Sequence, residues 1–483
     1  MSTFSGLTAA SSALFTSQRA MDVTGQNIAN VNTDGYSRQR VDLKSVSAST
    51  VPAVFSTGSG IGEGVDGDSV IRIRDAFMES RAQAEHATTA SMTVRQTTLN
   101  QIEDAFHEPG DDGLQAQLSK MWSAWGDVTN NTTVANGGGA RTAVLQTTQT
   151  VVASLHTISS TLDAQWSQNL DDLGVLVDDV NASAASIATL NQSIKRAGQA
   201  GLPTNELSDK RDALVLKIAE QTGATSTSET DGTVTVNLGG VTLVSGSTTI
   251  SLALGGGTGP ATAKSDPPKI VTAPGGTTVR PGGTAEGQLT AMSTTIPGYR
   301  TAIDDVAQKL ATTLNDAHQN GYDLGGEPGQ PLLNDGAGTD NDPSATGNPS
   351  KVTAANIHLR ITDPDKLAAA SLPKTAAGGA ASGDSHNADT VAALGSAAGS
   401  ADSVYRQMIV GLGVQASVAT GNLTAQNVIS TQVDSARLSV SGVSIDEEMT
   451  NMLQFQHAYS AAARMITAID GMLDTVINRM GVS

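Results

Sequence analysis

Apolar residues recur at alternating steps of three and four at both ends of this chain, and this spacing limits its fold more than any other feature. Near the N-terminus the repeat consists of Leu7, Ala10, Leu14, Ser17, Met21, Thr24, Ile28 and Val31. Near the C-terminus it consists of Met452, Phe455, Tyr459, Ala462, Ile466, Ile469, Leu473, Val476 and Met480. Such spacing puts all members of a repeat on one stripe of a helix, as in the seam of a coiled coil.

A helix with a single apolar stripe needs a partner to cover it. We therefore predict terminal helices over 5–31 and 444–480 that pair with each other and with neighbouring copies. A helix facing an ordinary bundle core has the same spacing, but the position of both repeats at the extreme ends favours assembly. Ser444 and Glu447 predict a capping box at the start of the second helix, with Arg479 favourably placed at its other end. The predicted subunit interface comprises Leu7, Leu14, Met21, Ile28, Met452, Phe455, Tyr459, Ile466, Ile469, Leu473 and Val476.

The composition narrows the possible functions. A net charge of -19, from 28 basic and 47 acidic residues, disfavours binding to nucleic acid and to anionic membrane surfaces. The absence of cysteine excludes disulfides, thiolate metal sites and a cysteine nucleophile. With 3% aromatic residues and 50 glycines among 483 residues, elongated helical layers with small β modules are favoured over large compact cores.

The N-terminal segment does not have the pattern of a cleaved signal peptide. Its first basic residue is Arg19, which lies well inside the helical repeat. No run of about eighteen apolar residues is present, so no transmembrane helix is predicted. We expect either a cytosolic protein or one exported by a route that needs no cleaved hydrophobic signal.

The region between the terminal helices predicts a helical stem with β-rich insertions. Strand patterns at 38–43 and 70–73 flank a Gly- and Ser-rich loop at 52–68. Further helices are predicted at 76–107, at 114–128, at 141–197 after a glycine-rich interruption at 136–139, and at 205–221, 296–318 and 401–438.

We therefore predict a multidomain α+β protein whose long terminal and central α-helices form a coiled-coil-like stem. Small β-rich domains are inserted in the middle of the chain. The expected domains are a terminal coiled coil at 1–43 with 442–483, a helical stem at 44–224 with 288–320 and 400–441, a β-rich insert at 225–287, and a Gly-, Pro- and Asp-rich outer insert at 321–399.

Several motifs that could carry chemistry lack the context that the chemistry needs. Residues 62–67 match G-x-G-x-x-G, but a strand-like run follows instead of the helix that a dinucleotide loop opens. The histidines are scattered, without the i, i+4 pair of zinc proteases. The acidic run at 340–342 lacks the rest of a calcium loop. We expect no catalytic residue, cofactor or metal site.

One segment near the N-terminus and one near the C-terminus resemble the signatures of bacterial flagellar axial proteins, the rod, hook and hook-associated family. The matching positions are Asn27, Asn30, Gly35, Tyr36, Arg38 and Gln39 in the first, and Asp446, Glu447, Phe455 and Gln456 in the second. The Tyr-Ser-Arg-Gln sequence after Gly35 is typical of the hook-associated branch. The segments 64–75, 207–214 and 314–323 also resemble this family, whereas 325–359 match it poorly.

The resemblance implies a structural adaptor that polymerises at the hook–filament junction and is needed for filament assembly and motility. It implies export through the flagellar type III channel to an extracellular location. The implied partners are further copies in a ring, the hook protein, a second junction protein, and an export chaperone that binds the C-terminal helix at 452–480. No nucleic acid and no membrane insertion are expected. The alternatives are the hook or distal rod protein, and then a secreted enzyme; the Phe455–Gln456 pair and the long helix at 141–197 favour the junction protein.

Overall fold

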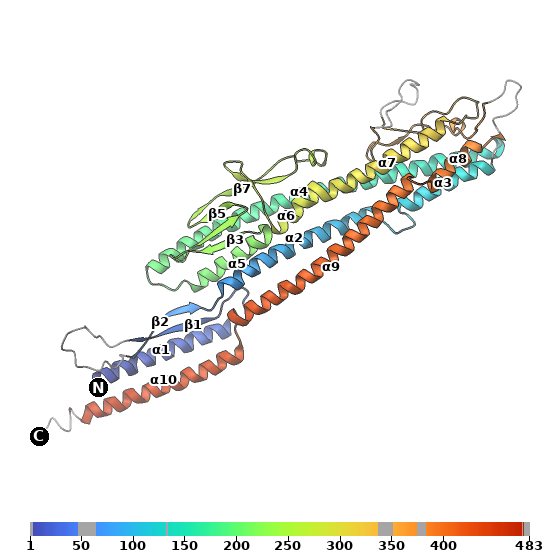
Figure 1. Ribbon diagram of the computed structural model, residues 1–483. Helices are drawn as coiled ribbons and strands as arrows, with labels where there is room; N and C mark the ends of the chain where they lie inside the picture. The colour runs from blue at the N-terminus through green and yellow to red at the C-terminus, as the bar shows by residue number, and fades with distance from the viewer. Residues whose placement is uncertain are drawn as a thin grey trace.

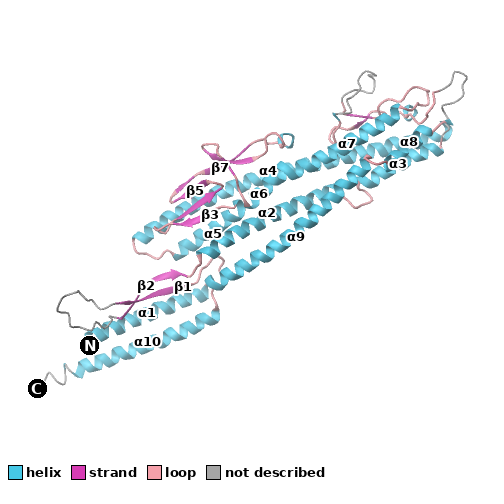
Figure 2. Ribbon diagram, viewed as in Figure 1, coloured by secondary structure: helices cyan, strands magenta, loops and turns pink. Residues whose placement is uncertain are grey.

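The computed structural model shows an elongated molecule in which long helices run along one axis and both ends of the chain lie at the same end (Figure 1). It describes residues 3–46, 64–131, 134–336, 351–373, 383–475 and 477. Long helices form most of the molecule, and short strands gather in small antiparallel sheets (Figure 2). The predicted α+β class with a helical stem and small β insertions is confirmed.

The stem consists of packed helices whose apolar stripes face one another. Ile303, Val306, Leu310 and Leu314 lie at steps of three and four and are fully buried. Trp166 is also fully buried, and its indole N–H donates to the carbonyl oxygen of Met292 at 2.9 Å. The stem helices are α2 (Ala76–Phe106), α3 (Leu114–Asn130), α4 (Val134–Gln199), α5 (Asn205–Thr222), α6 (Gly283–Thr290), α7 (Ile296–Gln319) and α9 (Ala401–Ser441).

Helix α4 is longer than the sequence pattern predicts. It begins at Val134 and continues through the glycine-rich run at 136–139, which we expected to interrupt it. A glycine costs about 1 kcal/mol relative to alanine in a helix, so it weakens a helical turn without preventing it. With 66 residues, α4 extends for about 100 Å and connects both insertions to the stem.

The β insertion lies on one flank of α4. One sheet has the order β3-β4-β5-β6 and the other the order β7-β8-β9, and both are antiparallel. Asn191 and Asn181 on α4 bond the backbones of Val234 and Leu252, which fixes each sheet against the helix. The strands are β3 (Thr225–Ser228), β4 (Val234–Leu238), β5 (Val241–Ser245), β6 (Thr248–Thr249), β7 (Ser251–Gly255), β8 (Lys269–Ala273) and β9 (Thr278–Val279). Because α6 begins at Gly283, the last residues of the predicted range 225–287 are helical.

The outer insert covers the far end of the stem. It contains a short ladder of β10 (Leu333–Asn334) and β11 (His358–Leu359), and α8 (His386–Ala393) packs on α3 and α7. His318 on α7 holds this insert. Its Nδ1–H donates to the Gln330 carbonyl oxygen at 2.6 Å, and its Nε2 accepts from the Ala368 N–H at 2.8 Å. This arrangement requires the neutral imidazole.

Acid should loosen the outer insert through His318. Burial lowers the pKa of His318 from 6.5 to about 4, so the unfolded state binds the extra proton between these values and stability falls as the pH drops from 6.5 to 4. The expected loss is about 3 kcal/mol. Amide hydrogen exchange around Gln330 and Ala368 at pH 7 and pH 4.5 checks this. A His318→Gln variant should have a less stable outer insert at pH 7, but its insert should lose less stability between pH 7 and pH 4.5 than that of the unchanged chain. An equal loss of stability in the variant and the unchanged chain would contradict the assignment to His318.

The two ends of the chain form a separate layer, which we call the terminal unit. It consists of α1 (Thr3–Ala29), the antiparallel hairpin of β1 (Gln39–Val46) and β2 (Gly64–Arg72), and α10 (Ile445–Asp474). Helices α1 and α10 lie side by side (Figure 1). Its buried core is small: Ala20, Val23 and Val41, with Phe455 and Val70 packed against them.

Strand β2 begins at Gly64, inside the range predicted as loop. A Cβ atom on Gly67 would lie 2.6 Å from Thr16 Cγ2, and one on Gly64 would lie 2.5 Å from Ser12 Oγ. These glycines therefore allow the strand to approach α1 closely. The described part of the G-x-G-x-x-G segment is thus a strand; Gly62 lies outside the described residues.

Candidate assembly interface

Asn27 is the centre of the hydrogen bonds that join the two ends of the chain. It lies in the last turns of α1 and is 1% exposed. Its Nδ2 donates to the Gln39 carbonyl oxygen at 2.8 Å and to Glu448 Oε2 at 3.0 Å. Its Oδ1 accepts from the Gln39 N–H at 3.0 Å and from the Tyr36 hydroxyl at 2.8 Å. One buried amide therefore connects α1, β1 and α10 with all of its donors and acceptors engaged.

Arg38 adds the charged part of this connection. Its Nε donates to Glu448 Oε1 at 2.7 Å and its NH1 donates to Glu447 Oε2 at 2.8 Å. The Glu448 carboxylate is almost completely buried, whereas that of Glu447 is exposed. Burial, together with the nearby Asp209 and Glu448 carboxylates, raises the pKa of Tyr36 to about 12, so its hydroxyl stays protonated and donates to Asn27.

The predicted capping box is not formed within the described chain. Ser444 does precede α10 as the N-cap residue, but its side chain makes no capping hydrogen bond. The Glu447 carboxylate, which was expected to complete the box, is engaged by Arg38 instead. A charge-assisted bond to a guanidinium is stronger than a bond to a neutral N–H, so it takes the side chain. Arg479 lies outside the described residues.

Gly35 makes the turn between α1 and β1 possible. Its φ of 78° lies in the left-handed region, as expected from its place after the helix. A Cβ atom here would be 3.6 Å from Ala213 Cβ, an ordinary contact, so space is not the constraint.

We predict that Gly35→Ala destabilises the terminal unit by about 1 kcal/mol, because alanine disfavours a positive φ. Gly35→Asn is the matched control, since asparagine tolerates this region better and should cost less. The rate of amide hydrogen exchange in α1 and α10 measures the stability of the terminal unit in both variants. Equal costs for alanine and asparagine would show that the backbone conformation is not the cause.

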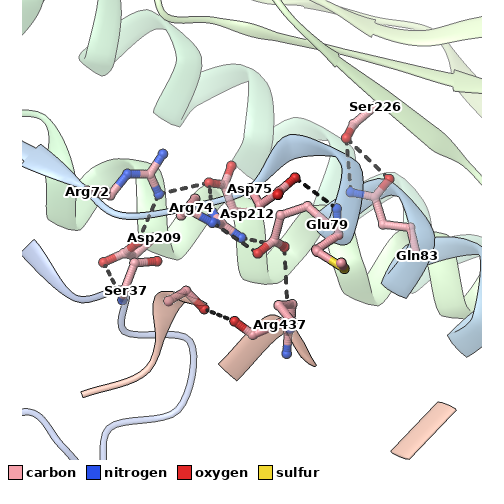
Figure 3. Close-up of polar contacts among 12 residues, drawn as sticks. Ser37, Arg72, Arg74, Asp75, Glu79, Gln83, Asp209, Asp212, Ser226 and Arg437 are labelled. Atoms are coloured by element: carbon pink, nitrogen blue, oxygen red, sulfur yellow. Dashed lines mark hydrogen bonds and ion pairs between the residues drawn. The ribbon is translucent and has the colours of Figure 1, made fainter. Parts of the chain in front are cut away.

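A second polar cluster joins the terminal unit to the stem, and Figure 3 shows it. Arg72 in β2 donates to Asp209 and Asp212 on α5, both at 2.8 Å. Arg74 pairs with Asp212 and with Glu79 at the start of α2. Arg437 on α9 lies 3.6 Å from Glu79. We call these residues, with the Ser37 N–H that donates to Asp209 at 3.2 Å, the joint.

Parts of the joint lie in the segments 64–75 and 207–214, which resemble the flagellar family but show no pattern that predicts a contact between them. No local pattern could have paired them, because Arg72 and Asp209 are separated by more than a hundred residues. The joint brings together the C-terminal end of β2, two stem helices and the last turns of α9. It therefore sets the direction in which the terminal unit leaves the stem.

The predicted interface residues within the described chain are buried or half-buried, and two of them contact other parts of the terminal unit. Ile469 is buried with its Cδ1 against Gly6, and Phe455 packs against the core of the terminal unit. The others are half-buried: Leu7, Leu14, Met21, Ile28, Met452, Tyr459, Ile466 and Leu473. Val476 lies outside the described residues. The family-motif residues Asp446 and Gln456 are exposed on α10, and Asn30 bonds Gln26 and Thr33 within its own turn.

A different set of apolar side chains on α10 points away from the rest of the chain. Ile445, Met449 and Leu453, at steps of four, are each about half exposed, and Met465 and Met472 are as exposed. We call Ile445, Met449 and Leu453 the outer face of α10. This face was not among the predicted interface residues, which follow the stripe with three-and-four spacing.

A hollow beside the joint is lined by Arg72, Arg74, Glu79, Arg211 and Asp212. It is the kind of feature that would favour an enzyme, since convergent ionisable groups line it. These charges are paired with one another at 2.6 to 3.0 Å, and Arg74 also pairs with Asp212. Among the described residues no group of three or more His, Cys, Asp or Glu could hold a metal ion. The arrangement fits a structural connection.

Three profiles of flagellar proteins match the chain. The flagellar hook-associated protein FlgK helical domain matches residues 99–333. The flagella basal body rod protein matches 7–36, and the flagellar basal body rod FlgEFG protein C-terminal matches 434–480. The two rod profiles thus cover most of α1 and α10.

Full-length relatives decide the family. The chain is 33% identical to flagellar hook-associated protein 1 of Bacillus subtilis (strain 168) over 523 residues, which cover 100% of this chain and 99% of the relative. The chain belongs to the flagellar hook-associated protein 1 family. It is also 25% identical to the protein of that name from Escherichia coli (strain K12), over 97% of this chain and 98% of the relative.

A solved structure has a similar fold. The flagellar hook junction protein FlgK from Burkholderia pseudomallei aligns with a TM-score of 0.62 at 16% identity, over 75% of this chain and 100% of that chain. The predicted flagellar family is confirmed, and the chain is a structural protein of the bacterial flagellum.

Proposed function

We propose that the chain is a non-enzymatic adaptor that polymerises at the hook–filament junction through its terminal unit. One observation supports this most: the signature residues at both ends of the chain lock α1, β1 and α10 together while leaving the outer face of α10 uncovered. A contiguous exposed apolar face is a mark of a protein contact, because soluble monomers rarely keep large ones. In this proposal the terminal units form the inner layer, the stem the middle layer and the insertions the outside.

The proposed partners follow from this layout. Further copies form a ring, the hook protein lies on one side and a second junction protein on the other. Before export, a chaperone covers the C-terminal helix, because its apolar residues would otherwise face water. Export through the flagellar channel then places the protein outside the cell. Of these steps, assembly into the ring requires burial of the outer face of α10.

Two alternatives are less well supported. A hook or distal rod protein would have the same terminal helices as this chain. The two rod profiles match only the two ends of the chain, at 7–36 and 434–480. The match over the whole length to hook-associated protein 1 favours the junction. A secreted enzyme would need unpaired reactive groups in a hollow, and those beside the joint are paired.

The test is deletion of the gene in a flagellated bacterium that carries it. We expect complete hooks without filaments, and flagellin released into the medium. Reintroduction of the full-length gene should restore both filaments and swimming. Normal filaments in the deletion strain, or hooks that are themselves missing, would contradict the junction role.

A further inference from the structure

The stem helix α9 contains an uncharged segment that is exposed to solvent. Between Arg406 and Asp434 no residue is charged. Along this segment Val410, Val414, Val418 and Val428 are 54–66% exposed. Gly421 and Ala425, which are also exposed, continue their spacing at steps of three and four. We call these six residues the α9 strip.

The opposite face of the same helix is already covered. Leu412, Ala416 and Ala419 are buried, and Gln426 bonds Glu85 on α2 at 2.7 Å. The α9 strip is therefore not a core face waiting for another element of this chain. From Val410 to Val428 it spans roughly 27 Å, which is long for an exposed surface without charges.

The α9 strip borders a groove between α2, α7 and α9. Arg95, Leu99, Tyr299, Ala302 and Met408 line it, together with Gly411, which follows Val410 in α9. Nearer the terminal unit, Leu438 and Val440 of α9 are also exposed, on other sides of the helix. In Figure 1, α9 and α10 lie on the same side of the molecule.

We propose that the α9 strip is the surface through which the stems of two neighbouring copies pack. This rests on the proposed function, because it extends the contact of the terminal units along the stem. The charge of the chain identifies the partner. Each copy carries -19, so acidic residues of two copies brought together at a contact repel each other, and a contact free of them is favoured. The α9 strip meets this condition, whereas the outer side of α4 carries Asp171, Asp172 and Asp178.

A membrane is the other surface that favours uncharged helices. Two helical stretches of the described chain, 138–199 and 386–474, are long and apolar enough to cross one by length and composition alone. A spanning helix is apolar on every side. Helix α9 has Gln407, Gln415, Asn422 and Gln432 around it, and one side is packed on α2. These features favour a protein partner.

The test uses a photo-crosslinking amino acid at position 418 of the full-length chain, expressed in cells that lack the unmodified copy. Hook–junction particles are isolated and irradiated, and the adducts are identified by mass spectrometry. We expect an adduct of twice the chain mass that contains peptides of this chain only. Its yield should be at least ten times that obtained with the probe at Asp171 on α4, the matched control.

The outcomes separate this inference from the proposed function. Adducts to a different protein or to lipid, or no adduct above the yield at Asp171, would overturn the α9 contact. If the particles nevertheless contain the chain in normal amount, the adaptor role stands. If the chain is absent from the particles, the proposed function fails and this inference fails with it.

Discussion

Replacing Arg38 with alanine should destabilise the terminal unit by about 3 kcal/mol, because the buried Glu448 carboxylate then loses its cation. Glu448 is 2% exposed, so water cannot replace the guanidinium without opening the contact between β1 and α10. Asn27 would still donate one hydrogen bond to the carboxylate, which limits the loss. The expected result is faster amide exchange in α10 with unchanged exchange in the stem helices.

Glu447→Ala is the matched control for this effect. It removes the second carboxylate bound by Arg38, but that carboxylate is 62% exposed, so its pair should contribute less than about 1 kcal/mol. Tenfold or greater acceleration in the Arg38 variant with little change in the Glu447 variant would support the assignment. Equal acceleration in both would show that burial of Glu448 does not control the contact.

Leu453→Asp should abolish incorporation into the junction while leaving the free chain folded. Leu453 is 55% exposed, so the substitution should change the stability of the monomer by no more than about 0.5 kcal/mol. In the proposed assembly the same position is buried, and an unpaired carboxylate there costs several kcal/mol. Every 1.4 kcal/mol is tenfold in binding, so incorporation should fall at least tenfold. We expect secreted but unincorporated chain, with flagellin in the medium.

Leu473→Asp distinguishes the outer face of α10 from the seam. Leu473 is half-buried on the same stripe of α10 as Ile469, which packs against Gly6 of α1, so this variant should loosen the two helices already in the free chain. Amide exchange of the purified monomer separates the two cases. Normal filaments with Leu453→Asp, or a monomer as disturbed by Leu453→Asp as by Leu473→Asp, would contradict the assignment of the two faces.

The spacing of apolar residues was enough to predict the long helices and the pairing of the two ends. The left-handed turn at Gly35 also followed from local sequence, because glycine after a helix commonly adopts this conformation. The helices and this turn could be predicted because the residues that determine them lie within one or two helical turns of each other. The same reasoning overestimated the glycine interruption before α4, because a cost of about 1 kcal/mol per glycine weakens a helix without ending it.

The contacts between distant segments could not be predicted from one sequence. Glu447 satisfies the pattern of a capping box, yet Arg38, far away along the chain, takes its carboxylate. No local pattern predicts that Glu448 is buried and bonded by Asn27 and Arg38, because these contacts form only when α10 lies beside β1. The outer face of α10 was missed for another reason: steps of four at Ile445, Met449 and Leu453 continue for too few turns to stand out beside the longer seam.

The most direct test of assembly through the terminal unit is the accessibility of one cysteine at position 453. The chain contains no cysteine, so Leu453→Cys gives a single reactive thiol. A maleimide should label it rapidly in the purified monomer and at least ten times more slowly in isolated hook–junction particles. Ser247→Cys, in the exposed turn between β5 and β6, should be labelled at similar rates in both. Equal labelling of Leu453→Cys in monomer and particles would contradict the account.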